Sequence, residues 1–383
     1  KEGKRGAGAM KRFAAGLLAL LLLGALPKGN AQAAAETPEV AAGGAALMEM
    51  DSCRMLAGWN EHVKLPMAST TKIMTALLAI ERCELDRVVK IPDAAVGVEG
   101  SSMYLAKGEE LRVIDLLYGL MLTSGNDAAV ALAIEIAGSE EDFARLMNER
   151  AEELGCTETN FVTPNGLHDP EHYTTAYDLC RIACAAMRSE TFRTIVSTEY
   201  YQTQSGDKTR TLKNKNKILW QYDGGNGVKT GFTKAAGRCL VFSAERGGTQ
   251  LVGVVLKCPG MWDEAKKLLD FGFDNYRTRR LIEAGLRVGF VAVRGGEKKG
   301  LELSAKNDIL YPLSVDGTDT LRWTLESPDE VAAPVQAGTE LGRLKLYCND
   351  EMVYDTALYA AETVEAAAYR FYIDEILERF RAG

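Results

Sequence analysis

A serine and a lysine three residues apart are the first group in this sequence that could carry out nucleophilic chemistry. Ser69-Thr70-Thr71-Lys72 begins an apolar periodic segment, so the two side chains are expected on one face at the start of a helix. A serine hydroxyl is a poor nucleophile until a neighbour takes its proton, and lysine can do so when burial and another cation lower its pKa. The helix N-terminus would supply backbone N–H groups for a developing oxyanion.

This spacing is a weak signal by itself, because the chain contains a second copy at Ser205-Gly206-Asp207-Lys208. The second copy lies in a polar turn between strand-like runs and no helix follows it. We therefore interpret it as a chance match and place the nucleophile at Ser69.

Two further polar triplets follow in order along the chain. Ser124-Gly125-Asn126 is predicted to form a tight turn between helical segments, and Lys229-Thr230-Gly231 is predicted on a strand. Each has an ordinary structural interpretation, since Ser and Asn cap helices and such a strand edge is common. Together with Ser69 and Lys72, in this order, they indicate one reaction centre.

Hydrophobic periodicity predicts the elements that must position these groups. Residues 45–59 are typical of a hairpin with its turn at 51–54, and residues 70–82 of a buried helix. Strands at both ends of the segment, with helices between them, favour an α+β fold in which helices flank an antiparallel sheet. The other predicted helices cover 113–137, 140–154, 175–187 and 262–276, and the other strands cover 226–232, 237–245 and 250–257.

The end of the chain has a different pattern. Short strand-like runs separated by turn residues predict a small all-β domain, a β-sandwich, over 280–360. Residues 361–383 predict an amphipathic helix whose apolar stripe includes Val364, Phe371 and Phe380. Such a helix can lie on a membrane surface or dock on its own protein, and we favour the membrane surface although its polar face is not lysine-rich.

The N-terminus predicts export. A basic leader at Met10-Lys11-Arg12 precedes the apolar run 13–26 and a small-residue cleavage pattern at Ala31-Gln32-Ala33. The run is shorter than the ~20 residues that a membrane span needs, and an uncleaved anchor is the alternative. We assign 1–35 to a signal peptide and the residues upstream of it, and we expect an extracytoplasmic protein.

Composition excludes some functions and bounds others. The 383 residues are 46% hydrophobic, enough for two domains or slightly more, and 45 basic against 53 acidic residues give a net charge of -8. That sign argues against nucleic acid as a partner. The eight cysteines are spread singly; Cys180 and Cys184 could bridge, bind metal or pack, and we favour packing. His168 and His172 lack further ligands at metal spacing, so neither metal nor organic cofactor is predicted.

The three motifs together are the set found in penicillin-binding proteins and class A β-lactamases. From about Ala45 to the C-terminus, the sequence resembles one group in particular, the low-molecular-mass penicillin-binding proteins that are serine-type D-alanyl-D-alanine carboxypeptidases of the peptidase S11 family. This resemblance implies a β-lactamase/transpeptidase-like domain over 36–279, followed by the small all-β domain and the terminal helix. It also includes Gly100-Ser101-Ser102-Met103, LLYGLMLTSGNDAAVALA, Asn165-Gly166-Leu167, Tyr173-Thr174-Thr175-Ala176 and KTGFT.

The same resemblance implies a role for each motif residue. Ser69 would be acylated and Lys72 would be its base, while Lys229 would keep Lys72 neutral by like-charge repulsion. Peptidoglycan stem pentapeptides would lose their terminal D-alanine, and β-lactam antibiotics would inhibit covalently. The remaining implied roles are proton relay and amide positioning by Ser124 and Asn126, carboxylate binding by Thr230 with Thr233, and an oxyanion hole from the backbone N–H groups of Ser69 and Phe232, beside Gly231.

Two alternatives remain open from the sequence. A β-lactamase shares the acylation machinery but needs a glutamate for rapid hydrolysis, and Glu171, the one glutamate in 161–173, lacks the class A pattern around it. A non-catalytic peptidoglycan-binding scaffold could keep the fold, but the presence of every motif residue argues against it.

Overall fold

The computed structural model describes residues 37–368, which divide into two compact units between Arg277 and Thr278. The larger unit, residues 37–277, contains all three motifs. The smaller unit, residues 278–368, is built from strands. The signal peptide predicted over 1–35 lies outside the described residues.

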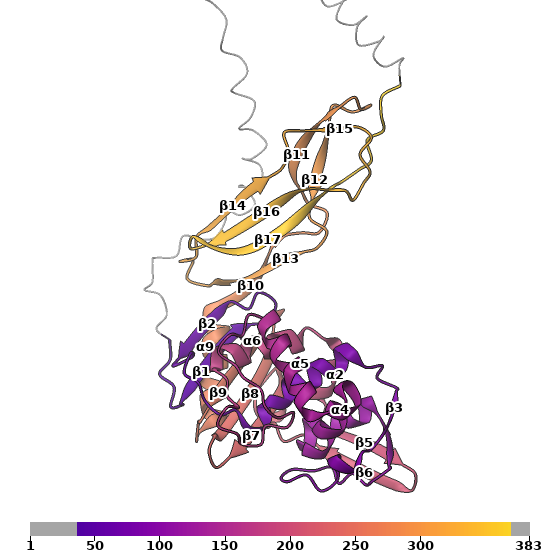
Figure 1. The fold of residues 1–383 in the computed structure, drawn as a ribbon. Helices are drawn as coiled ribbons and strands as arrows, with labels where there is room; N and C mark the ends of the chain where they lie inside the picture. Colours follow the sequence, from indigo (N-terminus) through magenta and orange to yellow (C-terminus); the bar gives the residue numbers. More distant parts are fainter. Residues whose placement is uncertain (1–36, 369–383) are drawn as a thin grey trace, which may run out of the picture. The chain divides into compact units, whose positions relative to one another are not determined.

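A five-stranded antiparallel sheet forms the centre of the larger unit (Figure 1). Its strand order is β2-β1-β9-β8-β7, so β7, which carries Lys229, is an edge strand. The hairpin predicted over 45–59 is confirmed, with Leu47 opposite Ala57. The strands are β1 (Gly44–Glu49), β2 (Met55–Trp59), β7 (Gly225–Thr233), β8 (Gly237–Arg246) and β9 (Thr249–Leu256).

Both faces of this sheet are covered, which explains the apolar run of β9. Successive residues of β1 point to opposite faces: Leu47 packs in a cluster with Leu269 of α9 (Met261–Asn275), whereas Met48 packs in the cluster that contains α2. All of β9 is buried. A strand covered on both faces does not alternate between apolar and polar residues, so its sequence reads as a continuous hydrophobic segment.

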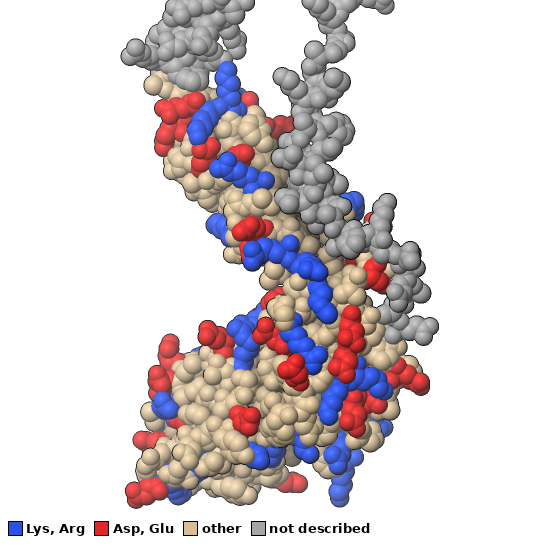
Figure 2. All heavy atoms as spheres, turned by 180° about the vertical axis from the view of Figure 1, so that it is seen from behind, with Lys and Arg blue, Asp and Glu red and all other residues tan. Residues whose placement is uncertain are grey.

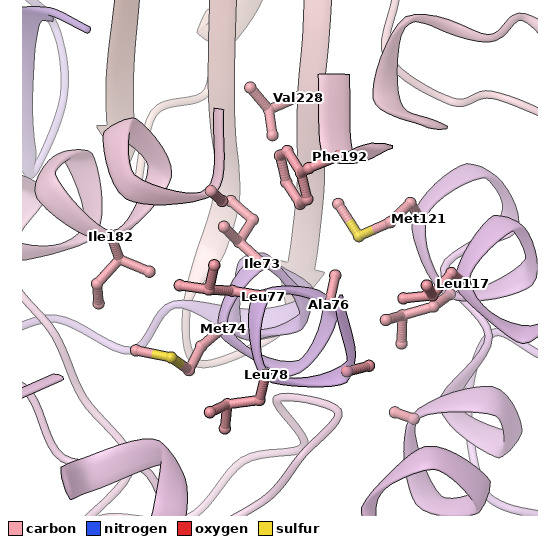
Figure 3. Close-up of a cluster of buried hydrophobic side chains, with 14 of the residues drawn as sticks. Ile73, Met74, Ala76, Leu77, Leu78, Leu117, Met121, Ile182, Phe192 and Val228 are labelled. Atoms are coloured by element: carbon pink, nitrogen blue, oxygen red, sulfur yellow. The ribbon is translucent and has the colours of Figure 1, made fainter. Parts of the chain in front are cut away.

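The buried helix predicted over 70–82 is confirmed as α2 (Lys72–Arg82), preceded by the short 3-10 helix η1 (Ala68–Thr71). Its side chains point in several directions into the apolar core, as Figure 3 shows. Because the whole first two turns of α2 are buried, Lys72 at its start is removed from water as well. The surrounding side chains that Figure 3 labels on other elements are Leu117, Met121, Ile182, Phe192 and Val228.

The segment predicted as one helix over 113–137 is interrupted at the second motif. Helix α3 (Val113–Tyr118) passes into a π-helical turn, η3 (Gly119–Thr123), and α4 (Asn126–Ala137) begins after it. Ser124, between them, is left-handed with φ 65°. The predicted tight turn at Ser124-Gly125-Asn126 is therefore present, and the π-helical turn displaces the chain at that point.

The other helices of the larger unit surround α2 and the sheet. The helix predicted over 140–154 is confirmed, and Ser139 caps it by accepting a hydrogen bond from the Asp142 N–H at 3.0 Å. The remaining elements are η2 (Asp93–Ala95), α5 (Glu140–Glu153), α6 (Ala176–Met187), α7 (Glu190–Ser197), α8 (Ile218–Gln221), and two hairpins formed by β3 (Val88–Lys90) with β4 (Glu110–Arg112) and by β5 (Tyr200–Ser205) with β6 (Lys208–Lys213).

The smaller unit confirms the predicted small all-β domain. A six-stranded sheet has the order β14-β16-β17-β12-β11-β15, and β10 pairs with β13 in a second sheet. Residues such as Leu303, Leu344 and Leu358 form its core. The strands are β10 (Tyr276–Ile282), β11 (Arg287–Arg294), β12 (Gly300–Ser304), β13 (Ile309–Ser314), β14 (Leu321–Glu326), β15 (Glu330–Ala332), β16 (Glu340–Cys348) and β17 (Glu351–Ala360).

The amphipathic helix predicted over 361–383 is not formed in its described part. Residues 361–368 are non-helical, and Val364 and Ala366 form isolated bridges with Val335 and Gly296. Val364 is 1% exposed and packs in the core of the smaller unit. The helix predicted for 361–368 was wrong because Val364 fits the spacing of an apolar helical stripe although it packs in the core of a β domain. Residues 369–383 lie outside the described residues.

Charged residues of both signs are interspersed over the face drawn in Figure 2. A mixed surface of this kind gives this face no extended field of one sign.

Candidate active site

The serine of the first motif lies in a turn that its two neighbours close. The hydroxyl of Thr70 donates to the Met67 carbonyl at 2.6 Å, and that of Thr71 donates to the Ala68 carbonyl at 2.8 Å. Ala68 is left-handed with φ 50°. This arrangement, which we call the nucleophile turn (Ala68–Thr71), leaves Ser69 half-buried at the start of α2.

The lysine of the first motif is fully buried and has three polar neighbours. Lys72 Nζ lies 2.6 Å from Asn126 Oδ1, 2.6 Å from the Asn165 carbonyl oxygen and 3.0 Å from Ser69 Oγ. The first two neighbours can only accept. A neutral amine has two hydrogens for them and one lone pair left, which is then available for the proton of the Ser69 hydroxyl.

The charge state of Lys72 follows from its surroundings. Burial is the largest cause that lowers its pKa, and the charges of Lys229 and Lys215 lower it further, against a smaller opposing effect of Asp127. The pKa of Lys72 therefore lies well below its ordinary value. The two causes expected from the sequence, burial and another cation, are both present, and burial is the larger.

The second motif reaches Lys72 through Asn126. The Asn126 backbone N–H donates to the Ser101 carbonyl at 2.7 Å, and its side-chain amide donates to the Glu99 carbonyl. Ser124 is buried two residues earlier. Within the described residues, its hydroxyl is not among the groups that hydrogen-bond to Lys72, so the structure joins Asn126 directly to the lysine and Ser124 only through the turn.

A buried carboxylate fixes the segment that lines this site. Asp127, which follows Asn126 and is 1% exposed, accepts hydrogen bonds from Ser102 Oγ at 2.6 Å and from the N–H groups of Met103 and Leu105, each at 3.1 Å. In the sequence, the Gly100–Met103 segment is marked only by the family resemblance. Asp127 explains why that segment accompanies the second motif.

The third motif lies on the edge strand β7, against the nucleophile turn. A Cβ atom at Gly231 would lie 3.0 Å from the Met67 carbonyl oxygen and 3.1 Å from the Ser69 backbone nitrogen. Glycine therefore allows the strand to approach the turn closely. Thr230 and Thr233 are partly exposed beside it, the Thr233 hydroxyl accepts from the Ala236 N–H at 3.0 Å, and the Phe232 side chain is 66% exposed.

Lys229 is the second buried lysine of the site. It is 1% exposed, and its Nζ donates to the Thr230 carbonyl at 2.9 Å. Burial lowers its pKa to about 7, with a contribution from the charge of Lys215. Lys215 Nζ itself donates to Ser101 Oγ at 3.1 Å. Lys215 could not be predicted as a site residue, because a single lysine in a polar run has no spacing pattern.

The loop 161–173 completes the site from the other side of Lys72. It supplies the Asn165 carbonyl, and its Pro164 carbonyl accepts from the Thr75 hydroxyl of α2 at 2.6 Å. Gly166 is left-handed, and a Cβ there would lie 2.0 Å from the Ala68 carbonyl oxygen. Glycine is therefore required for this loop to lie against the nucleophile turn.

Comparison with known proteins identifies the family. A family model described as D-alanyl-D-alanine carboxypeptidase matches residues 31–260, and one described as penicillin-binding protein 5, C-terminal domain, matches residues 276–366. The D-alanyl-D-alanine carboxypeptidase DacF of Bacillus subtilis is 35% identical over 375 residues, covering 94% of this chain and 96% of that protein. The chain belongs to the peptidase S11 family.

Solved structures of similar proteins agree with this assignment. The match to penicillin-binding protein 5 of Haemophilus influenzae covers 86% of this S11 chain and 99% of that protein's chain, with 29% identity and a TM-score of 0.72. The DD-transpeptidase of Streptomyces K15 covers 62% of this chain and 100% of its own, with 35% identity and a TM-score of 0.59. The predicted penicillin-binding protein fold followed by an all-β domain is confirmed.

The second S-x-x-K of this S11 chain occupies a different environment. Ser205 and Lys208 face each other at the end of the β5–β6 hairpin, where the Ser205 hydroxyl donates to the Glu110 carbonyl at 2.8 Å. Lys208 is exposed. This pair therefore lacks the burial and the neighbouring lysine that surround Lys72.

The cysteines of this S11 chain are all free thiols. Cys180 and Cys184 are buried on α6, in the same apolar cluster as α2, which fits the packing interpretation. Among residues 37–368, no group of three or more His, Cys, Asp or Glu side chains is arranged to hold a metal ion.

Proposed function

We propose that this chain is a serine-type D-alanyl-D-alanine carboxypeptidase that removes the terminal D-alanine from peptidoglycan stem pentapeptides through an acyl-enzyme on Ser69. One observation carries the proposal. Lys72 Nζ is buried and lies 3.0 Å from Ser69 Oγ. As a neutral amine it donates its two hydrogens to the Asn126 and Asn165 oxygens, which leaves its lone pair for the proton of that hydroxyl. This is a serine with an adjacent neutral base.

The chemistry proceeds in two steps. Ser69 Oγ attacks the carbonyl carbon of the penultimate D-alanine while Lys72 takes the hydroxyl proton, and the oxyanion is held by the backbone N–H groups of Ser69 and Phe232. Collapse breaks the peptide bond, and the proton that Lys72 took from Ser69 passes by way of Ser124 to the departing amine. Lys72, neutral again, takes a proton from a water molecule as the water oxygen attacks the ester. That proton goes to Ser69 Oγ as the ester bond breaks, and the shortened peptide leaves.

The substrate is held along the edge of β7. An edge strand presents unpaired N–H and C=O groups to which an extended peptide can add as another strand. The terminal carboxylate meets Lys229, Thr230 and Thr233. Asn126 has one amide hydrogen beyond the bond to the Glu99 carbonyl, which is available to the substrate amide.

Hydrolysis of β-lactams as the main activity is the weaker alternative. The side chain of Glu171 is exposed, and the loop 161–173 contacts Lys72 through the carbonyl of Asn165 rather than through a carboxylate. The described loop 161–173 therefore does not place a carboxylate on Lys72, as the glutamate that hydrolyses the acyl-enzyme of a class A β-lactamase would require. β-Lactam antibiotics then act as covalent inhibitors.

The experiment that tests this proposal combines a fluorescent penicillin with a stem pentapeptide. A carboxypeptidase forms a stable covalent adduct with the penicillin and releases one D-alanine per pentapeptide. A β-lactamase would release the hydrolysed penicillin within seconds, and a non-catalytic scaffold would form no adduct. Either of these results would overturn the proposal.

Removal of metal ions is expected to leave the release of D-alanine unchanged. The reason is that the serine route uses Lys72 as its base and backbone N–H groups as its oxyanion donors. The measurement is the initial rate of D-alanine release before and after dialysis against EDTA. A large loss of rate that zinc restores would contradict the prediction.

The family acts on peptidoglycan, so the chain works outside the cytoplasm. We propose that the signal peptide at 1–35 directs its export and that the segment after residue 368 attaches it to the outer face of the cytoplasmic membrane. Among the described residues, none of the helices has the length and apolar character of a membrane span. Fractionation of cells that express the full chain, or a chain ending at residue 368, tests attachment: release of only the shorter chain supports it, and equal release contradicts it.

A further inference from the structure

His172 lies in the loop 161–173, which contacts the nucleophile turn at Ala68 and Thr71. From the sequence, His172 was interpreted only as lacking the further ligands of a metal site. It is 2% exposed, and both ring nitrogens are engaged: Nε2 lies 2.7 Å from the Thr71 hydroxyl oxygen, and Nδ1 lies 2.9 Å and 3.3 Å from the backbone nitrogens of Val162 and Thr163. None of these contacts is used in the reaction described above.

These contacts define one tautomer. The N–H groups of Val162 and Thr163 can only donate, so Nδ1 must be the unprotonated acceptor, and the ring hydrogen is on Nε2. Nε2–H then donates to the Thr71 hydroxyl, whose own hydrogen goes to the Ala68 carbonyl at 2.8 Å. The bonds run in one direction, from the loop backbone through His172 and Thr71 to the nucleophile turn.

This chain of hydrogen bonds, which we call the relay, joins two parts of the site whose relative position matters for the reaction. At one end, Ala68 precedes Ser69, whose N–H is a proposed oxyanion donor. At the other end, the same loop supplies the Asn165 carbonyl to Lys72 at 2.6 Å and places Gly166 against Ala68. A shift of the loop would therefore displace an acceptor of the base and the turn of the nucleophile together.

We propose that His172 is a positioning residue for acylation: as the neutral Nε2–H tautomer it fixes the loop 161–173 to the nucleophile turn through Thr71. The proposal rests on the carboxypeptidase function proposed above. It assigns a purpose to a buried histidine that contacts neither Ser69 nor Lys72.

A second proton on His172 would break the relay. That proton would face two N–H donors at Nδ1. Burial is the largest cause that lowers the pKa of His172, to about 4. Asp169 raises this pKa, and the charges of Lys72 and His168 lower it. In the unfolded chain the pKa is about 6.5, so below that pH the unfolded state binds more protons. The stability that depends on neutral His172 is complete above pH ~6.5 and declines as the pH falls toward 4.

The test compares His172→Asn with His168→Asn, since His168 is an exposed histidine of the same loop. Asparagine keeps an acceptor on the side of Nδ1 and has no donor that reaches Thr71. We expect His172→Asn to lower the rate constant of acylation by a fluorescent penicillin about 10- to 100-fold, with its non-covalent binding constant changed less than about threefold. His168→Asn should acylate like the wild type.

Thr71 supplies the second arm of the test. Thr71→Val removes the hydroxyl at nearly constant volume and should reproduce the loss, whereas Thr71→Ser should restore most of the rate. Because the two residues act in one relay, the double variant of His172→Asn with Thr71→Val should lose little more than either single variant. If His172→Asn does not fold, the contrast between the two Thr71 variants decides.

The outcomes separate this inference from the proposed function. A wild-type chain that forms no penicillin adduct refutes the function itself. A wild-type chain that labels while His172→Asn acylates within twofold of it, or a double variant whose losses multiply, refutes only the positioning role. An unfolding midpoint that declines between pH 6.5 and 4 less steeply for His172→Asn than for the wild type supports the tautomer assignment, and equal declines overturn it.

Discussion

Replacing Ser69 by alanine is expected to abolish both covalent labelling by penicillin and release of D-alanine, a loss of about 10⁴-fold or more. Ser69 is the hydroxyl that lies beside a desolvated lysine, 3.0 Å from its Nζ. The fold should remain, because the side chain is only half-buried and its one-atom truncation leaves Asn126 and the Asn165 carbonyl as partners of Lys72. Labelling followed on a denaturing gel, together with circular dichroism, measures both parts.

Ser205→Ala is the matched control, since it makes the same change in the other S-x-x-K. Its hydroxyl contacts a backbone carbonyl at the end of a hairpin, and labelling should be unaffected. Persistence of the adduct in Ser69→Ala, with its loss in Ser205→Ala, would show that the nucleophile had been assigned to the wrong copy.

Replacing Lys229 by glutamine is expected to lower acylation at neutral pH about 10²-fold and to change the shape of its pH profile. In the wild type, acylation should rise as Lys72 loses its proton and fall as Lys229, whose pKa is about 7, loses the charge that binds the substrate carboxylate. Because the two lysines are coupled, the apparent pKa values of the rising and falling limbs belong to the pair of lysines and not to either one alone. Glutamine removes the falling limb and, by removing a positive neighbour of Lys72, moves the rising limb to higher pH.

The measurement is the second-order acylation rate against pH for the wild type, Lys229→Gln and Lys208→Gln. Lys208 is exposed on β6 and controls for the general loss of one positive charge. If the rising limb stayed in place in Lys229→Gln, burial together with Lys215 would be sufficient to set the pKa of Lys72, and Lys229 would serve only the carboxylate.

The sequence allowed much of the larger unit to be predicted, for physical reasons that are visible in the structure. Helix α2 is buried on nearly every side in its first turns, so its apolar spacing is strong, and the hairpin β1–β2 has an evident turn. The third motif was placed correctly on a strand. The interruption between α3 and α4 was less clear, because a π-helical turn keeps the apolar character of the helices around it.

The partners of the site residues could not be predicted in the same way. Lys72 is held by the carbonyl of Asn165 and Asn126 by those of Glu99 and Ser101, and a backbone carbonyl has no residue signature. The histidines were assessed only as metal ligands, so the relay through His172 was missed. At the other end of the chain, Val364 matched a helical stripe but packs in a sheet domain, where local periodicity gives no warning.

Lys72 and Lys229 are both exposed to 1% or less, and two such buried lysines in one small site lower the stability of the unit that contains it. Neither can be ionised there without losing its hydration, and neither packs as well as an apolar side chain of the same length. The two lysines that the proposed reaction uses therefore lower the stability of the folded state. Methionine at Lys72 and Lys229 would be expected to stabilise this unit and to remove the proposed base and carboxylate site, so the conflict between stability and activity is concentrated in two residues.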